Sequence, residues 1–526
     1  MLCAKILLAA LATAFGFTVN VLDAIAPLKS TIYDSFGSSH ASTTLRATWR
    51  DHFKQIQRDV PFQRVRFHGI LDDDLSTYLN GEANGALVFD TLDFLVAQGI
   101  HPTLELGFMP DALAFNSSLT TFHYKGGTSM YRDEAAFRAF ITGLLTLIVQ
   151  RYGIAEVLQM RVEIWNEPNC GFGPTWVQQQ GCGPDQGNQT AYFQLYQASA
   201  EAVKAVDARI PVGGPATAQL AWLPEFLNFT SAAGVPLDFV SSHLYPTDPF
   251  LPQTRDSFMD AVAAAAGVAG AAGKPLFLTE FNAGLGPPRL CHNFSLLDSS
   301  YAAVFALHAH LLAQGVPALA SMSWWTFTDF GFEEQGADPH PYWPGHTKFG
   351  AMTRTGVPKP IYRGLQLIAA QAGAPGGALP VAPQGGASAT QLYRDAHGAV
   401  IGASEGAVDV LVSLSGRTLT ALAGNFNASF LDLPPPATVS LVVRGLTAPL
   451  PTQGTLELLD STHANPMGAW EAAGSPLYPS ASETAGEMAA SQLVPEPLAL
   501  TPSGPDAVTL TFTLESYAMA RVVIAL

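Results

Sequence analysis

Two glutamates occupy matching positions, each directly after a short apolar run. Glu167 follows the run that begins at Val162 and precedes Pro168, and Glu280 ends the run that begins at Pro275. Because Pro168 cannot donate a hydrogen bond to a neighbouring strand, the first run should stop there and leave Glu167 at the carboxyl end of a strand. Two carboxyl groups held this way can cleave a glycosidic bond, because one protonates the leaving oxygen while the other attacks the anomeric carbon or activates water.

Other side chains at the ends of expected strands could complete such a site. His68 and His243 each end an apolar run, and Tyr245 lies two residues after His243, so on a regular strand these two share a face. Two histidines near paired carboxylates favour contacts to sugar hydroxyls or tuning of the acid and the nucleophile, although each could instead be a satisfied structural group. Trp325 could offer a flat face to a sugar ring, or it could pack in a core.

The elements that must position these residues alternate between β-like and helical patterns from about residue 30 to 370. The expected strands cover residues 31–41, 64–69, 102–108, 162–169, 212–216, 239–246, 276–280 and 320–327. Expected helices between them include residues 87–98, 134–152, 191–206, 258–272 and 300–314. Eight strands with interleaved helices predict an α/β fold, a (β/α)8 TIM barrel over residues 30–370, whose active site lies at the carboxyl ends of the strands. An open doubly wound sheet is the alternative, but no Gly-rich phosphate loop follows a strand.

The remaining chain predicts a second domain. Residues 371–390 are rich in Gly and Pro and are interpreted as a linker-like segment. Residues 391–526 contain runs with period-two alternation, at 408–414, 438–443, 455–459, 508–514 and 519–524, which predict an accessory β-sandwich. This part carries no comparable pair of carboxylates, so no chemistry is assigned to it.

The first 21 residues resemble a targeting segment. Lys5 precedes a short apolar stretch, which predicts a signal peptide over residues 1–21, with a membrane anchor as the alternative. The chain also carries five acceptor sites for N-glycosylation: Asn116, Asn188, Asn228, Asn293 and Asn427. Together these features predict a secreted protein, or one in the lumen of the secretory or lysosomal pathway.

The cysteines fit an oxidising compartment better than a metal site. Cys170 and Cys182 flank a Gly-rich loop just after Glu167, so a disulfide between them is plausible. Cys291 would then be unpaired, or could replace one of the two. Their spacing matches no zinc motif, and we expect no metal.

Length and charge restrict the possible partners. With 526 residues and 48% hydrophobic content, the chain is long enough for two domains with separate cores. A formal charge of −17 with only 26 Lys and Arg residues argues against nucleic acid and against an anionic membrane surface, since both require clustered positive charge. The paired carboxylates instead predict a glycoside or oligosaccharide as the partner.

Six segments taken in order carry a resemblance to a known family. They are Arg66-Phe-His-Gly-Ile-Leu-Asp-Asp-Asp, Glu105-Leu-Gly-Phe-Met-Pro-Asp-Ala-Leu, Trp165-Asn-Glu-Pro-Asn, Gly213-Gly-Pro-Ala, Thr279-Glu-Phe-Asn and Trp325-Thr-Phe-Thr-Asp-Phe-Gly-Phe-Glu-Glu. The ordered set resembles glycoside hydrolase family 39, and more closely its β-xylosidases than its α-L-iduronidases.

The resemblance implies roles for individual residues. Glu167 would be the general acid/base and Glu280 the nucleophile of a retaining double displacement, without a cofactor. Asn166 would bind the sugar 2-hydroxyl, and a tyrosine placed like Tyr245 hydrogen-bonds the nucleophile in families of this architecture. The family also uses an acidic pair to hold xylose hydroxyls, which here corresponds to Glu333 and Glu334, although Gly331 departs slightly from the family pattern.

We therefore expect an enzyme that releases β-D-xylose from the non-reducing ends of xylo-oligosaccharides. An α-L-iduronidase or another barrel glycosidase is the alternative in chemistry, and a non-catalytic carbohydrate-binding protein is the alternative in class. An iduronidase needs a cation for the uronate carboxylate, and the nearest candidate, Arg66, should face away from the site by strand alternation or pack inside the barrel.

Overall fold

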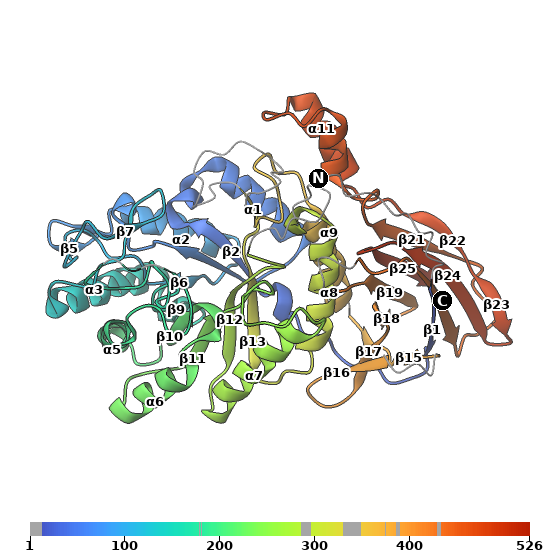
Figure 1. The fold of residues 1–526 in the computed structure, drawn as a ribbon, viewed down its shortest axis with the longest axis horizontal. Coiled ribbons are helices and arrows are strands. Elements are labelled where there is room, and N and C mark those ends of the chain that lie inside the picture. The colour runs from blue at the N-terminus through green and yellow to red at the C-terminus, as the bar shows by residue number, and fades with distance from the viewer. Residues whose placement is uncertain are drawn as a thin grey trace.

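The computed structural model describes residues 13–177, 179, 181–285, 296–329, 349–373, 375–384, 390–428 and 433–526. Figure 1 shows two domains side by side: a barrel surrounded by helices, coloured blue to green, and a β-sandwich, coloured mainly orange to red. A long helix of the barrel domain, α8, lies between the barrel strands and the sandwich.

Eight parallel strands close the barrel, as the sequence predicts. They are β2 (Ser35–His40), β3 (Arg64–His68), β6 (Thr103–Glu105), β9 (Arg161–Glu163), β10 (Val212–Thr217), β11 (Phe239–His243), β12 (Leu276–Phe281) and β13 (Leu319–Trp324). Trp324 of β13 pairs with Phe36 of β2 to close the ring. Because all the strands run in the same direction, their carboxyl ends meet on one face, where the predicted site residues should gather.

Helices on the outside cover the barrel. They are α1 (Ala47–Asp59), α2 (Ala86–Ala97), α3 (Glu134–Tyr152), α4 (Ile154–Val157), α5 (Gln189–Val206), α6 (Leu223–Ala233), α7 (Ser257–Ala271), α8 (Tyr301–Ala313) and α9 (Pro360–Ala372). Helix α3 has the bounds expected from its sequence because both ends are marked: the Asp133 side chain accepts a hydrogen bond from the Ala136 amide, and Gly153 ends the helix at a positive φ of 79°.

Helix α8 is apolar on almost every side, and its environment explains why. It packs against α9 and also contacts strands of the sandwich. Its large buried side chains include Tyr301 and Phe305, which both contact Phe426 of the second domain. A helix that buries its whole circumference is expected between two packed layers.

The second domain is a two-sheet sandwich, as predicted. One sheet contains β15 (Ala382–Pro383), β1 (Thr13–Asn20), β20 (Ala437–Arg444), β24 (Ala507–Leu514) and β23 (Thr501–Gly504) in that order. The other contains β16 (Thr390–Arg394), β17 (Val400–Glu405), β18 (Val408–Ser415), β19 (Thr418–Asn425), β25 (Met519–Ala525), β21 (Gln453–Leu459) and β22 (Glu496–Ala499), with β14 (Gly377–Ala378) paired to β18. Alternate residues such as Val439, Leu441 and Val443 point into the shared core.

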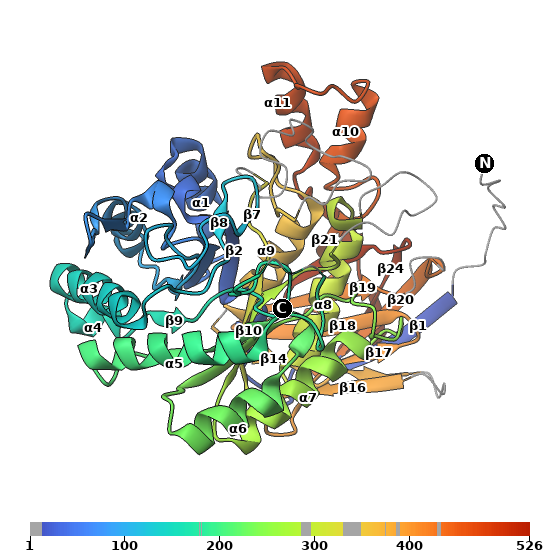
Figure 2. The same ribbon diagram turned by 60° about the vertical axis from the view of Figure 1, so that its left-hand side comes forward.

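The structure corrects the domain limits at the amino-terminal side of this sandwich. Strand β1 lies within the expected signal segment, yet it pairs in parallel with β20 along its whole length and buries Phe17 and Val19. Figure 2 shows it beside the orange strands of the second domain. A short apolar stretch has the same composition whether it is a targeting segment or a buried strand, which is why the sequence does not separate the two. A signal function for the residues before Thr13 stays a prediction.

The linker-like segment also belongs to the folded domains. Helix α9 extends to Ala372. Within residues 371–390, β14 pairs with β18 in one sheet of the sandwich and β15 pairs with β1 in the other. Gly377 lies so close to the Ala26 backbone that a Cβ there would overlap it, so part of the glycine content reflects close packing.

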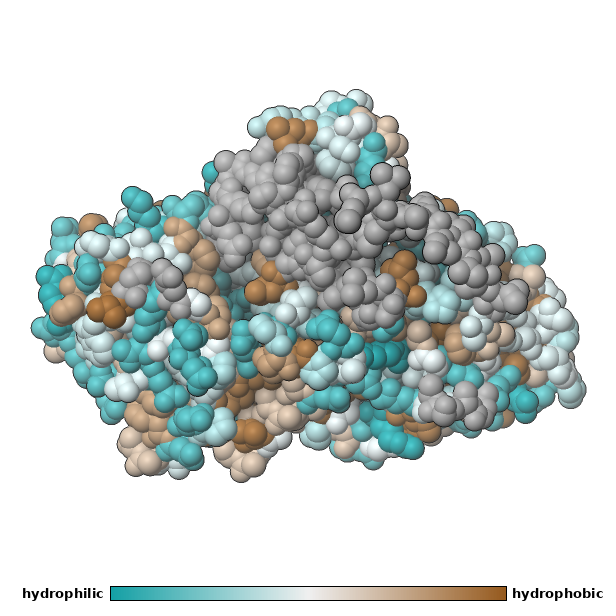
Figure 3. Space-filling view, in the orientation of Figure 1, coloured by the Kyte–Doolittle hydropathy of each residue, from teal (hydrophilic) through white to brown (hydrophobic). Residues whose placement is uncertain are grey.

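Several small elements complete the fold. Helices α10 (Pro466–Ala472) and α11 (Ala481–Ala490) project from the sandwich at the top of Figures 1 and 2. The barrel loops carry the hairpins β4 (Tyr78–Leu79) with β5 (Glu82–Ala83), and β7 (Thr120–Thr121) with β8 (Gly126–Gly127). In the coloured part of Figure 3, hydrophobic residues form small groups separated by hydrophilic ones. Within the described residues, every helix is too short or too polar to cross a bilayer.

Candidate active site

The two predicted catalytic glutamates meet at the carboxyl end of the barrel. Strand β9 ends at Glu163, and the chain then turns through Trp165 and Glu167, which both have positive φ. The Glu167 amide is fixed to the Ala216 carbonyl at 2.8 Å, whereas Glu280 lies within β12. One carboxylate oxygen of Glu167 and one of Glu280 lie within 4.8 Å of each other. The sequence prediction that these side chains come together therefore agrees with the geometry.

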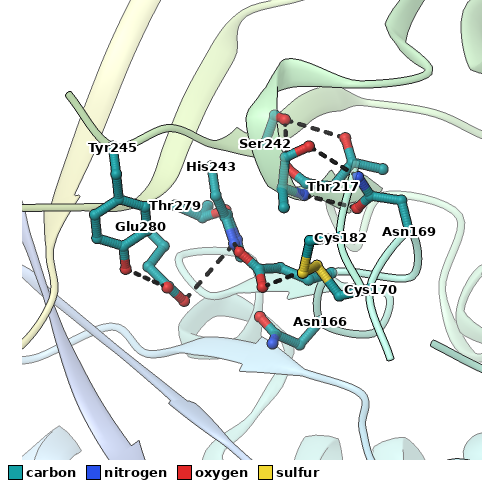
Figure 4. Close-up of polar contacts among 12 residues, drawn as sticks. Asn166, Asn169, Cys170, Cys182, Thr217, Ser242, His243, Tyr245, Thr279 and Glu280 are labelled. Carbon is teal, nitrogen blue, oxygen red and sulfur yellow. Dashed lines mark hydrogen bonds and ion pairs between the residues drawn. A yellow bond between two sulfur atoms is a disulfide. The ribbon is translucent and has the colours of Figure 1, made fainter. Parts of the chain in front are cut away.

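Glu280 is surrounded by hydrogen-bond donors. The Tyr245 hydroxyl donates to its Oε1, and Arg66 Nη1 lies 3.3 Å from its Oε2. Figure 4 shows Tyr245 and His243 approaching Glu280 from the same side. Burial raises the pKa of Glu280 above its ordinary value, and the nearby Glu167 acts in the same direction, whereas His243 and Arg66 oppose the rise. The donors therefore counteract the cost of an anion in a buried position.

His243 links the two carboxylates. Its Nδ1 lies 2.9 Å from Glu167 Oε1 and 3.7 Å from Glu280 Oε2. Burial lowers the pKa of His243 to about 4, so the ring is neutral near pH 7, and its Nδ1 can donate to an ionised Glu167 or accept from a protonated one, according to its tautomer. The position fits the predicted role of tuning the acid and nucleophile.

Arg66 lies beneath the two catalytic candidates. It takes the second of its two expected orientations, because it is fully buried inside the barrel and points at Glu163 (2.6 Å), Glu105 (2.8 Å) and Glu280. Burial disfavours its charge, but these carboxylates outweigh that effect and raise the pKa of Arg66. Glu163 also accepts a hydrogen bond from Thr279 at 2.7 Å. Its two partners, Arg66 and Thr279, thus explain how Glu163 can lie deep in the barrel.

Asn166 is held by the same guanidinium. Arg66 Nη2 donates to its Oδ1 at 2.8 Å. Because Oδ1 is already used, the amide nitrogen is the atom that Asn166 can offer to a sugar hydroxyl. The side chain is buried beside Glu167, which is where a contact to the 2-hydroxyl is needed.

His68 and Trp325 form another wall of the site. His68 Nδ1 lies 2.7 Å from Glu105 Oε2, and the His68 ring centroid is 4.5 Å from that of Trp325. A Cβ at Gly37 would overlap the Trp325 ring, so the indole rests directly on the β2 backbone. Its neighbour Trp324 packs instead against Phe281 and Phe305 in the core.

The loop after Glu167 is fixed at both ends. The structure contains the disulfide between Cys170 and Cys182 that the sequence suggests, and Cys170 Sγ lies 3.5 Å from Glu167 Oε2. Asn169 donates to the Gly183 and Ala218 carbonyls, as the network beside the disulfide in Figure 4 indicates. The ends of this loop are therefore held together next to Glu167.

Several predicted residues lie elsewhere or outside the described chain. Glu333, Glu334, Cys291 and Asn293 are outside the described residues, so their predicted roles stay predictions. Among the other glycosylation candidates, Asn116 and Asn228 are exposed, whereas Asn188 and Asn427 are half-buried. Asn188 also caps α5 through its side-chain oxygen. Glycosylation at all these positions stays a prediction.

Sequence reasoning missed two acidic residues of the site. Glu105 ends a short apolar run, which is the same signal that identified Glu167 and Glu280, and its position in the third barrel strand could have revealed it. Asp248 carries no such signal because it lies in a turn, where it accepts a hydrogen bond from the Tyr245 amide at 2.8 Å. Burial raises the pKa of Asp248 to about 7, and the nearby Glu167 adds to the rise.

Known proteins match both the sequence and the fold. The model of "Glycosyl hydrolases family 39" matches residues 18–375. A β-xylosidase of Caldicellulosiruptor saccharolyticus is 36% identical over 348 residues, which cover 63% of this chain and 67% of the relative. A β-xylosidase of Geobacillus stearothermophilus is 30% identical over 351 residues, which cover 62% of this chain and 65% of the relative.

Solved structures extend the similarity to the whole chain. A monomeric β-xylosidase from Caulobacter crescentus CB15 has a TM-score of 0.76 at 26% identity, with 97% of this chain and 99% of that chain covered. A family 39 enzyme from Xanthomonas axonopodis pv. citri has a TM-score of 0.79 at 24% identity, with 98% of both chains covered, and this likeness concerns the fold. With the family model matching most of the barrel, the chain belongs to glycoside hydrolase family 39 and is a glycosidase.

Proposed function

We propose that the enzyme is a retaining β-xylosidase, which releases β-D-xylose from the non-reducing ends of xylo-oligosaccharides. The observation that carries the mechanism is the separation of Glu167 and Glu280, whose nearest carboxylate oxygens lie within 4.8 Å. Retaining glycosidases hold their carboxyl groups about 5–5.5 Å apart, whereas inverting enzymes need about 6.5–9.5 Å to admit a water molecule.

In the first step, Glu280 attacks the anomeric carbon as Glu167 gives its proton to the glycosidic oxygen. The bond from the anomeric carbon to the leaving oxygen breaks, and an ester bond to Glu280 forms. Positive charge develops on the sugar ring in this step, and the hydrogen bond from Asn166 to the 2-hydroxyl strengthens with it. Tyr245 and Arg66 hold the attacking carboxylate in a fixed orientation.

In the second step, Glu167 acts as the base. It removes a proton from water, the oxygen of that water attacks the anomeric carbon, and the ester bond to Glu280 breaks. Glu167 must lose and regain a proton in each cycle, and His243 at 2.9 Å offers a neutral partner that supports both forms.

The choice of xylose rests on the relatives and on the charges of the site. The two relatives described above, at 36% and 30% identity, are named β-xylosidases. Arg66 already contacts three acidic side chains, of which Glu163 and Glu280 suffice to balance its charge, and the buried Lys359 is matched by Asp298 and Asp329, so neither is available to bind a uronate. A neutral pentose without a carboxylate fits this environment better than iduronate.

The decisive experiment traps the proposed ester. The enzyme is incubated with a 2-fluoro-β-xyloside that carries a good leaving group, digested and mapped by mass spectrometry. We expect a fluoroxylosyl group on the peptide that contains Glu280, and no label on Glu280→Gln. A label on another residue, or full activity of Glu280→Gln on an aryl xyloside, would contradict the assignment.

A second variant tests the acid/base role independently. Glu167→Ala should hydrolyse an aryl xyloside slowly, and azide should restore turnover and give the β-xylosyl azide, since Glu280 still forms the ester. An α-azide would mean that the roles are exchanged. A parallel panel of aryl β-xyloside, β-glucoside, α-arabinoside and α-iduronide tests the substrate, and preference for the iduronide would reject a xylosidase.

A further inference from the structure

The floor of the site contains more acid than base. Arg66 faces Glu163, Glu105 and Glu280 at 2.6, 2.8 and 3.3 Å. Arg66, Glu163 and Glu105 are completely buried. With three ionised carboxylates, this cluster would carry two uncompensated negative charges away from water, which is costly. One of the three acids is therefore expected to hold a proton.

The contacts distinguish which acid this is. Glu163 accepts from Arg66 Nε and from Thr279, so both its oxygens have donors and its ionised form is favoured. Glu280 has donors from Tyr245 and Arg66 and is slightly exposed at the barrel mouth. Glu105 Oε2 meets Arg66 and His68, but its buried Oε1 has no hydrogen-bond partner among the described residues.

We propose that Glu105 is a neutral acid whose hydroxyl donates to His68 Nδ1, and that it thereby fixes the His68 tautomer that carries its proton on Nε2. Glu105 is then a positioning residue that acts through His68. His68 Nε2 lies 4.0 Å from Glu280 Oε2, so an N–H on this atom lies beside the proposed nucleophile and within reach of a sugar hydroxyl bound there. The inference deepens the proposed function and rests on it.

The electrostatic environment supports this distribution of protons. Burial raises the pKa of Glu105 to about 8, and Arg66 only partly offsets that rise. Burial and Arg66 hold the pKa of His68 well below its ordinary value, so the ring is neutral and carries one N–H. The charged or titratable groups that face this pair from neighbouring elements are His40, Arg66, Asp72, Glu163, His243 and Glu280.

A proton on Glu105 favours the proposed reaction because it helps Glu280 to stay ionised. A nucleophile must stay ionised, and each further negative charge nearby would raise the pKa of Glu280. If the one extra proton of the cluster resides on Glu105, Glu280 keeps its negative charge. His68 then presents its Nε2–H as a donor beside the reacting centre. An ionised Glu105 would instead accept from a protonated Nδ1 and leave Nε2 as a bare acceptor.

The direct test measures the His68 tautomer in the enzyme without substrate. The protein is labelled with 15N-histidine, and the His68 signals are assigned by their loss in His68→Gln. We expect Nε2 to be protonated and Nδ1 to be unprotonated at pH 7. The reverse pattern, with the proton on Nδ1, would overturn the proposal.

A matched pair of variants tests the charge of Glu105 by kinetics. Glu105→Gln and Glu163→Gln replace two equally buried partners of Arg66 by amides of the same size. If Glu105 is neutral, the acid limb of the pH profile of kcat/KM stays at its wild-type position in Glu105→Gln. In Glu163→Gln, which loses a real negative charge, the limb should move to lower pH by about one unit or more.

Further results would also reject the proposal. An equal downward shift in both glutamine variants would show that Glu105 is ionised. Full retention of kcat in a folded Glu105→Ala would show that Glu105 positions nothing. The tautomer measurement needs no substrate, so a wrong sugar assignment and a wrong proton assignment give different outcomes.

Discussion

At the residue scale, the proposed nucleophile Glu280 accepts a hydrogen bond from the Tyr245 hydroxyl. Tyr245 reaches Glu280 from the turn after β11, and Asp248 fixes that turn by accepting the Tyr245 amide proton. A hydroxyl that donates to a carboxylate favours its ionised form. Tyr245 therefore assists the proposed attack without changing covalently.

Replacement of Tyr245 by Phe removes the hydroxyl but keeps the ring. The variant therefore separates the hydrogen bond to Glu280 from the packing of the ring. A hydrogen bond to a charged group contributes about 1.5–3 kcal/mol, so kcat should fall by about 10- to 100-fold. Loss of the donor raises the pKa of Glu280, and because the ionised form is needed, the acid limb of kcat/KM should move to higher pH.

The control for this variant is Tyr196→Phe. Tyr196 is also buried, but its hydroxyl donates to the Pro236 carbonyl, away from the carboxylates. It should leave the acid limb in place. If Tyr245→Phe showed the same unshifted limb, the hydroxyl would have no influence on the ionisation of Glu280.

Single residues also show where sequence patterns stop being informative. The ends of apolar runs located Glu167, Glu280, His68 and His243, because a strand that ends in a barrel must place its last side chains at the mouth. The same pattern left the orientation of Arg66 open, since it depends on which strands curve around it. On a regular strand the side chains of Glu163 and Glu167 would share a face. This pattern does not hold here, because β9 ends at Glu163 and the following backbone turns.

At the element scale, the loop after β9 is the best example of local stabilisation near the chemistry. The disulfide closes a segment with a sequence separation of 12 residues beside Glu167. A cross-link of this kind stabilises mainly by restricting the unfolded chain, and the typical contribution is about 2–4 kcal/mol.

The double variant Cys170→Ser/Cys182→Ser tests this contribution without leaving a free thiol in the pair. We expect its free energy of unfolding to fall by about 2–4 kcal/mol in a denaturant titration. A reducing agent should destabilise the wild type to a similar extent and leave the variant unchanged. Equal stability of the two proteins before reduction would contradict a structural role for the disulfide.

Helices and barrel strands could be predicted well from the sequence, and short strands of the sandwich could not. Helix α3 has clear end signals at Asp133 and Gly153, and an apolar run marks β12, whereas β2 is rich in Ser and carries only a weak strand signal. Strands β14 and β15 have two residues each, and long-range pairing alone defines them. The sequence favours a signal peptide where β1 lies, because the strands that pair with β1 are hundreds of residues away in the chain.

At the scale of the whole molecule, a buried polar cluster joins the two domains. Asp409 of β18 accepts from Arg255 at 2.6 Å and from the Tyr393 hydroxyl, and His308 of α8 lies 3.1 Å away. Although burial opposes ionisation, Arg255 and His308 lower the pKa of Asp409 to about 2. The sandwich is thus attached to the segment before α7 and to α8 by a charged contact.

Asp409→Asn should weaken this contact in a pH-dependent way. Removing one member of a buried ion pair costs about 3–5 kcal/mol, which we expect as the loss of unfolding free energy at pH 7. The folded pKa lies below the unfolded one, so the contribution of Asp409 is complete above about pH 4 and is lost as the pH falls towards 2. The difference in unfolding free energy between the wild type and Asp409→Asn should therefore decrease as the pH falls from about 4 to 2.

An exposed aspartate of the same domain provides the comparison. Asp506→Asn should change stability by less than about 0.5 kcal/mol at either pH. If Asp409→Asn behaved like Asp506→Asn in urea titrations, the cluster would contribute nothing to the attachment of the domains.

The position of β1 also determines the order in which the protein can be completed during synthesis. Residues 13–20 leave the ribosome long before their parallel partner β20, which spans residues 437–444. The whole barrel is synthesised in between and can fold while Phe17 and Val19 are still without their sheet. Until β20 arrives, this early strand is an exposed apolar edge that a chaperone or another nascent chain could capture, so the yield of folded enzyme should depend on how long that interval lasts.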